Sequence, residues 1–152
     1  MNGYSKLFHS LLIATLVILF ISGLFLIPAF MIFRLEWNIE SIMEWPIISG
    51  DIRSTITVLH SIFGWLMIWL TGALWSIHMR SHWRLKENRT NGMMLNLLIA
   101  LLLASTLGMY YFGDELLSLY SSIVHSILGI LFPLTIFLHR HQGKKSLMPK
   151  SK

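Results

Sequence analysis

The chain has 152 residues, of which 55% are hydrophobic and only 12% are charged, and it contains no cysteine. A soluble domain carries about a quarter charged residues, so this composition argues against a soluble protein. The lack of cysteine excludes disulfides, iron–sulfur clusters, thiolate zinc sites and covalently attached c-type haem. The net charge of +5 does not indicate a nucleic-acid partner, because its placement follows membrane topology.

Four apolar runs are long enough to cross a membrane, because a hydrocarbon core of about 30 Å needs about 20 helical residues. They predict an all-α, integral membrane four-helix bundle that forms a single transmembrane domain over residues 1–152. The first run is too long for a signal peptide and is not followed by a small-residue cleavage site. The predicted helices cover residues 7–33, 54–79, 93–112 and 116–138.

Lysine and arginine residues fall mainly on one side of these helices. Apart from Arg34 and Arg53, all of them lie before the first helix, between the second and third, or at and beyond the end of the fourth. Every acidic residue except Glu87 lies on the other side. The positive-inside rule therefore predicts that both termini are cytoplasmic, with residues 141–152 as a basic cytoplasmic tail.

Residues 34–53 are predicted to form an outer loop that contains a short interfacial helix. Glu36, Glu40 and Glu44 recur every four residues, which places them on one helical face, and two tryptophans flank the segment as interface anchors. This acidic face either docks a basic partner or simply faces water.

Two segments of the chain share a histidine motif. "VLHSIFGW" contains His60, and "IVHSILGI" contains His125. Each follows a helix that carries a small hydroxyl residue and a glycine, in "ISGLF" and in "ASTLG". The pattern predicts a repeat of helix pairs, with His60 and His125 at matching depths.

These histidines are candidate haem ligands, because a polar group in lipid is costly and imidazole nitrogen suits haem iron. Ser61 and Ser126 follow them directly and are candidate hydrogen-bond partners. Glycines near the ligands would let a flat macrocycle approach the helix backbone, a role open to Gly64, Gly129 and Gly23. The alternative is that each histidine is an ordinary packing residue.

A second level of histidines lies nearer the cytoplasmic side. His139 follows His125 by 14 residues, so both share a helical face about 21 Å apart along the axis, which suits two stacked cofactors. His78 follows His60 by 18 residues, which is five whole turns and the same face. The other histidines at this level are His9, His82 and His141, of which the last two are expected at the surface.

The segments "LFHSLLIATLVILFISGLFL", "LHSIFG" and "VHSILGILFPLTIFLH" resemble the bacterial four-helix di-haem cytochrome b family, over about residues 4–140. This cytochrome b-561-type family includes the gamma subunits of formate dehydrogenases and the cytochrome b subunits of nickel–iron hydrogenases. The resemblance implies two haems b. It pairs His60 with His125 at the outer haem and His9 with His139 at the inner one, with His78 as the alternative inner ligand.

The resemblance also implies a function: a transmembrane electron-transfer subunit in the bacterial inner membrane that links a periplasmic redox partner to quinone. Arg53 outside, and Lys6, Arg80 or Arg84 inside, would then pair with haem propionates or simply anchor the helices. The loops are too short for a substrate domain, so no catalytic residue is predicted and a partner subunit would carry the chemistry.

Three alternatives to this function stay open. The first is a stand-alone haem b oxidoreductase that passes electrons from a small substrate such as superoxide to quinone, although the acidic outer side disfavours an anionic substrate. The second is a histidine-lined transporter, although none of the four runs carries an acidic residue within the membrane. The third is a structural subunit that has lost its haem.

Overall fold

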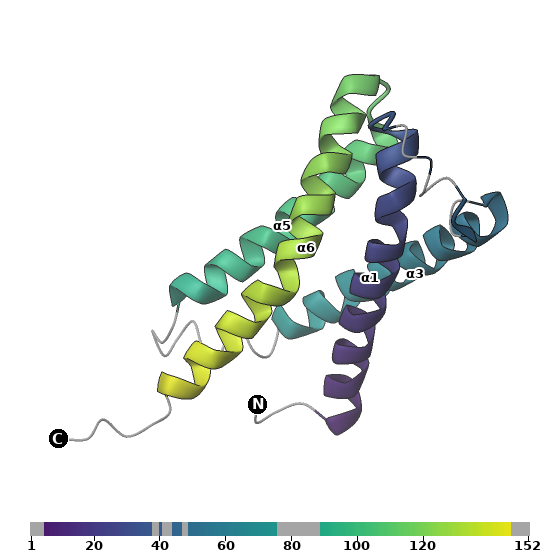
Figure 1. Cartoon of the computed structure of the whole chain (residues 1–152). Helices are drawn as coiled ribbons and strands as arrows, with labels where there is room; N and C mark the ends of the chain where they lie inside the picture. The colour runs from purple at the N-terminus through teal and green to yellow at the C-terminus, as the bar shows by residue number, and fades with distance from the viewer. Residues whose placement is uncertain (1–4, 38–39, 41–43, 47–48, 76–88, 147–152) are drawn as a thin grey trace. The chain divides into compact units, whose positions relative to one another are not determined.

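The computed structural model describes residues 5–37, 40, 44–46, 49–75 and 89–146, with the side chains of 89, 91 and 142–146 left out. Across these residues the chain is helical and contains no strand (Figure 1). All four main helices have spans long and apolar enough to cross a membrane, which confirms the predicted all-helical, four-span architecture. The helices are α1 Lys6–Phe33, α3 Gly50–Leu74, α5 Arg89–Tyr111 and α6 Glu115–Ser146.

A serine cap marks the start of the first helix, and two other helices extend beyond the apolar runs that predicted them. Helix α1 begins where the Ser5 hydroxyl accepts a hydrogen bond from the Phe8 amide at 3.2 Å. Helix α3 begins at Gly50, four residues before the predicted start, and carries Asp51 in its first turn, where a negative charge favours the helix dipole. Helix α6 continues to Ser146, beyond the predicted end at residue 138, because basic residues favour a helix C-terminus.

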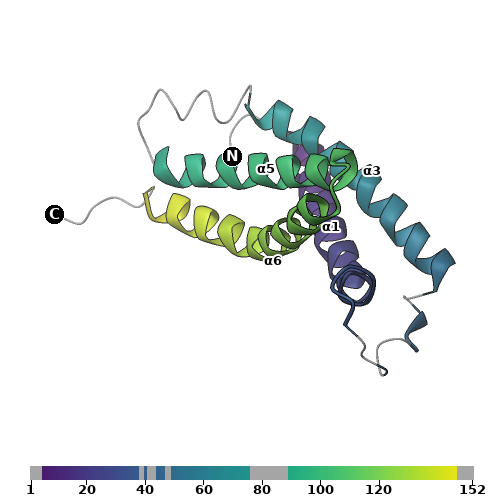
Figure 2. The ribbon, with the colours of Figure 1, turned by 90° about the horizontal axis from the view of Figure 1, so that it is seen from above.

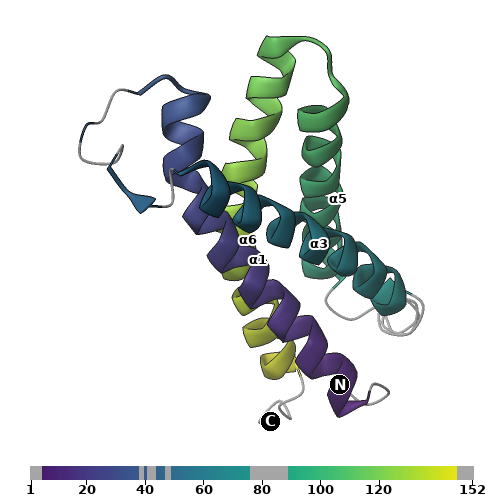
Figure 3. The ribbon, with the colours of Figure 1, turned by 90° about the vertical axis from the view of Figure 1, so that its right-hand side faces the viewer.

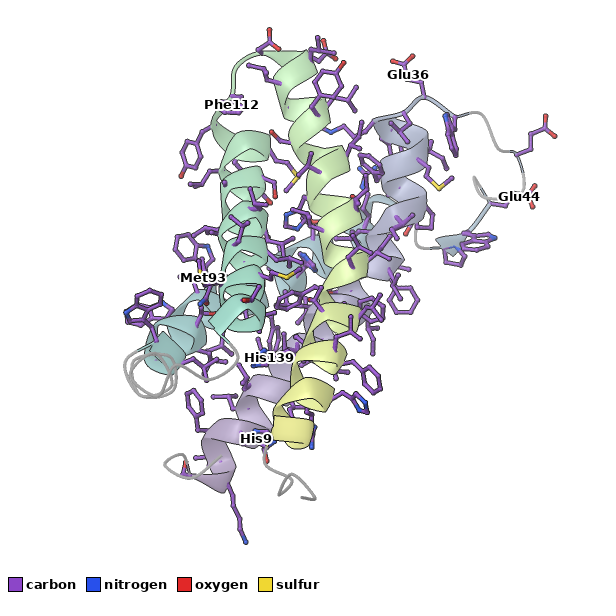
Figure 4. All side chains as sticks on the ribbon, turned by 90° about the vertical axis from the view of Figure 1, so that its left-hand side faces the viewer. His9, Glu36, Glu44, Met93, Phe112 and His139 are labelled. Carbon is purple, nitrogen blue, oxygen red and sulfur yellow. The ribbon has the colours of Figure 1, made fainter. Side chains whose placement is uncertain are left out.

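Some predictions fall on parts of the chain that the structure does not describe. The predicted interfacial helix in the outer loop lies largely on residues 38–39, 41–43 and 47–48. His78, His82 and the basic residues of the second-to-third connection lie within 76–88. Glu36 and Glu44, at the outer end of the first hairpin, are exposed (Figure 4).

The chain forms two compact units, Met1–Ile77 and His78–Lys152, and each contains one antiparallel pair of helices. We call the pair α1 and α3 the first hairpin, and the pair α5 and α6 the second hairpin. Helix α1 crosses α3 within the first hairpin (Figure 3). Helices α5 and α6 lie side by side along much of their length (Figure 2).

Small and hydroxyl residues fill the contact between the helices of each hairpin. In a bilayer such residues let helix backbones approach closely, whereas large apolar side chains face the lipid tails. The exposed side chains are accordingly dominated by leucine, isoleucine, phenylalanine and tryptophan. The buried residues are Leu12, Thr15, Ser22, Ala29 and Leu70 in the first hairpin, and Ser105, Gly108, Ser118 and Ser122 in the second.

Gly108 is where the second hairpin packs most tightly. A Cβ atom at this position would collide with the hydroxyl of Ser121 on α6 and lie 2.9 Å from the Ser121 Cβ atom and 3.1 Å from the Phe112 ring. The Ser118 hydroxyl donates across the same contact to the Met109 carbonyl at 3.2 Å. The position therefore admits only glycine without a shift of the helices.

We expect Gly108→Ala to destabilise the protein by about 1–3 kcal/mol, because the added methyl group overpacks the contact between α5 and α6. Gly92→Ala, on the same helix, is the matched control, since a Cβ atom there meets no atom within 4 Å. Thermal unfolding of both variants in detergent checks this. A Gly108→Ala midpoint equal to that of Gly92→Ala would contradict it.

Candidate functional site

The two motif histidines occupy equivalent positions in their helices. His60 lies ten residues after Gly50, where α3 begins, and His125 lies ten residues after Glu115, where α6 begins. Both side chains are therefore about 15 Å from the start of their helix along its axis. Each lies on the second helix of its own hairpin and faces the first.

In the first hairpin, the ring of His60 lies against the backbone of α1. Its Nδ1 atom is 2.8 Å from the Ser22 hydroxyl, whose side chain is only 3% exposed. The next residue, Gly23, leaves room for the imidazole, because a Cβ atom there would lie 3.3 Å from the Cε1 atom of His60. Ser22 and Gly23 of α1 thus bind and accommodate the His60 ring of α3.

In the second hairpin, the Nδ1 atom of His125 lies among three oxygen atoms of α5. They are the Ser105 hydroxyl at 3.1 Å, the Thr106 hydroxyl at 3.3 Å and the Leu102 carbonyl at 3.3 Å. The two hairpins therefore repeat one arrangement: a small hydroxyl residue on the first helix bonds to Nδ1 of the histidine on the second.

The serines next to the histidines have a different role from the one expected. The Ser61 hydroxyl donates to the Thr57 carbonyl at 2.9 Å, and the Ser126 hydroxyl donates to the Ser122 carbonyl at the same distance. Both bonds stay within the serine's own helix. The hydrogen-bond partners of the histidines are instead the hydroxyl residues of "ISGLF" and "ASTLG", whose similarity in the sequence indicated the repeat.

The glycines one turn after each histidine are not needed for packing. A Cβ atom at Gly64 or at Gly129 would meet no atom within 4 Å. Glycine inside a helix costs about 1 kcal/mol relative to alanine. These positions differ from Gly108, where neighbouring atoms exclude a side chain, and from Gly23, where a Cβ atom would crowd the His60 ring. They suit the close approach of a flat group.

Two histidines of the inner level are described: His9 near the start of α1 and His139 in the C-terminal part of α6 (Figure 4). His9 is in the first turn of α1, and His139 is 14 residues after His125 on α6. The Nδ1 atom of His9 is buried and makes no hydrogen bond among the described residues, unlike Nδ1 of His60. His78, the alternative inner ligand, lies outside the described residues, so the choice between His9 and His78 stays open.

Arg53 lies at the outer end of the first hairpin. Its guanidinium carbon is 4.3 Å from the centre of the Phe33 ring, in a cation–π contact that joins the start of α3 to the end of α1. Such a contact contributes about 0.5–1 kcal/mol at an exposed site. Arg53 therefore helps to hold the hairpin closed.

Within the described residues, no three histidine or acidic side chains gather as a metal-ion site. The arrangement in each hairpin is instead a single oriented imidazole next to an open helix face, which is what one axial ligand of a haem requires. No family model, curated protein or solved structure matches the chain.

Proposed function

We propose that the protein is a transmembrane electron-transfer subunit that holds haem b through histidines and links a periplasmic redox partner to quinone across the bacterial inner membrane. One observation carries the proposal. Each hairpin orients a histidine through Nδ1, at the same distance from the start of its helix, inside a membrane-spanning segment. Intramembrane ionisable residues are usually functional.

The residues of each hairpin fit a haem. Metal-bound histidines almost always use one ring nitrogen for the metal and donate from the other to a nearby oxygen. In both hairpins Nδ1 lies within hydrogen-bond distance of such an oxygen. Gly64 and Gly129 leave the helix surface open one turn from each histidine, and no neighbouring atom of their own hairpin requires a glycine there. Haem, when bound, supplies one-electron chemistry at a potential that its ligands and surroundings set.

The ligand pairs follow the family resemblance. His60 and His125 would hold the outer haem, and His139 with His9, or with His78, would hold the inner one. Arg53, whose guanidinium lies over the Phe33 ring, would offer its in-plane N–H groups to a propionate. The apolar side chains of the helices exclude water from the ligands, and the hydroxyls of α1 and α5 orient the imidazoles.

The alternatives are less well supported by the described helices. Acidic residues occur in them only in first turns, at Asp51 and Glu115, which disfavours a proton- or cation-coupled transporter. The exposed Glu36, Glu40 and Glu44 would repel superoxide at the outer side. A basic surface of a redox partner would be attracted there instead.

The first test is a dithionite-reduced minus oxidised spectrum of the detergent-purified protein, with haem quantified per chain. We expect two low-spin haems b. His60→Ala and His125→Ala should each remove the outer haem, since an axial ligand is lost. His141→Ala is the matched control, because this exposed histidine stacks on Phe137 at the cytoplasmic end of α6.

His9→Ala and His78→Ala would then identify the inner ligand. Protein that carries no haem after expression with ample haem would overturn the proposal and favour the transporter or a structural subunit. Loss of haem from His141→Ala to the same extent as from His60→Ala would also count against these ligand pairs.

We expect Gly64→Leu and Gly129→Leu to lower the haem content while the protein stays folded, because each side chain would enter the open space beside a ligand. Circular dichroism measures the helix content, and the reduced spectrum measures the haem. Gly92→Leu, at another open position on α5, is the control. Full haem content in both variants would show that these glycines do not face the macrocycle.

The proposed orientation can be tested by thiol labelling, since the chain has no cysteine of its own. In intact bacteria, a membrane-impermeant maleimide should label Glu44→Cys and Gly113→Cys, whereas Ser5→Cys should react only after permeabilisation. All three positions are exposed. Labelling of Ser5→Cys in intact cells would contradict the predicted orientation and place the N-terminus outside.

A further inference from the structure

We propose that both hairpins hold their histidine in the tautomer with the proton on Nδ1, and that Ser22 is the positioning residue that does so for His60. This inference deepens the proposed function, since the proton on Nδ1 leaves the lone pair on Nε2, the nitrogen that would then ligate iron. It concerns each hairpin separately and can be tested without any haem.

The direction of the hydrogen bond in the first hairpin follows from proton counting. A serine hydroxyl has one proton, and the Ser22 oxygen lies 2.6 Å from the Ile18 carbonyl and 3.2 Å from the Leu19 carbonyl, both of which can only accept. The Ile18 carbonyl is the closest of its partners, so we assign the proton to that bond, and the hydroxyl oxygen, 2.8 Å from Nδ1 of His60, then accepts. In this assignment Nδ1 of His60 donates to the Ser22 hydroxyl, which donates to the Ile18 carbonyl. Nδ1 can donate only if it carries a proton.

The second hairpin reaches the same tautomer by a different route. The hydroxyls of Ser105 and Thr106 both donate to the Leu102 carbonyl, at 2.8 and 2.9 Å. Nδ1 of His125 also lies 3.3 Å from that carbonyl, which can only accept. A carbonyl has only two lone pairs, so Nδ1 shares this oxygen with the two hydroxyls and also lies within reach of the hydroxyl oxygens themselves. The carbonyl, which no substitution removes, calls for a protonated Nδ1.

The two hairpins should therefore respond differently to loss of the serine. Ser22→Ala removes a hydroxyl acceptor at 2.8 Å from His60, whereas Ser105→Ala leaves the Thr106 hydroxyl and the Leu102 carbonyl close to His125. Alanine favours helix and is smaller than serine, so neither change should unfold the chain.

The test is nuclear magnetic resonance of isotope-labelled histidine nitrogens in the full chain, expressed under haem limitation. We expect His60 in the wild type to show a protonated Nδ1 and an unprotonated Nε2. Ser22→Ala should shift His60 toward the other tautomer, and Ser22→Thr, which keeps a hydroxyl, should restore the wild-type pattern. Ser105→Ala should leave His125 unchanged, and Ser61→Ala is the control beside His60.

In protein with haem, Ser22→Ala should raise the reduction potential of the haem that His60 holds. A ligand that no longer donates to the hydroxyl is less basic and stabilises the oxidised iron less. Ser61→Ala should leave the potential unchanged, because its hydroxyl bonds to Thr57 instead.

An unchanged His60 tautomer in Ser22→Ala would overturn the inference, as would a wild-type His60 with its proton on Nε2. A chain that binds no haem but shows the expected tautomer change would keep the inference and overturn only the proposed electron-transfer function. A chain that binds both haems but whose His60 tautomer does not respond to Ser22→Ala would keep the proposed function and overturn only this inference.

Discussion

The hydrogen bond between a histidine and a hydroxyl of the preceding helix is the interaction on which each hairpin depends. An imidazole in hydrocarbon must find a partner, because water is absent and an unsatisfied polar group costs several kcal/mol. Ser22 and Ser105 supply that partner, and both are small enough to lie between two helix backbones. Each serine therefore packs between the two helices of its hairpin and also orients the motif histidine, His60 or His125.

This dual role explains why the glycines fall into two classes. Gly23 and Gly108 lie on the first helix of each hairpin, where a Cβ atom would press on His60 or on Ser121. Gly64 and Gly129 lie on the second helix, one turn beyond the histidine, and face open space. Packing within the hairpin accounts for the first class and not for the second. Gly72 on α3 and Gly92 on α5 are equally open, so what sets Gly64 and Gly129 apart is their place one turn from a motif histidine, where the proposed macrocycle would lie.

Hydropathy and charge predicted the four spans, because the bilayer imposes a minimum length that any membrane helix must satisfy. The histidines were predicted because an ionisable residue in such a run is rare. Their partners were not: the sequence favoured Ser61 and Ser126, which are adjacent to the histidines. Neighbouring residues on a helix point in different directions, and a serine in a membrane helix readily bonds to its own backbone, as both do here. The partner lies across the hairpin, where only the register of two helices can identify it.

That register is set differently in the two hairpins. Residues 34–49 connect α1 to α3, whereas only residues 112–114 connect α5 to α6. Ser22 lies eleven residues before the end of α1, and Ser105 only six before the end of α5. Even so, both histidines lie ten residues into the second helix. The position of the hydroxyl shifts with the loop, while the depth of the histidine is constant. Packing within a hairpin constrains only the relative register of its two helices, so the equal distance of the two histidines from their helix starts is a separate feature of the repeat. It agrees with the proposed function, in which both histidines would hold one cofactor at a single level of the bilayer.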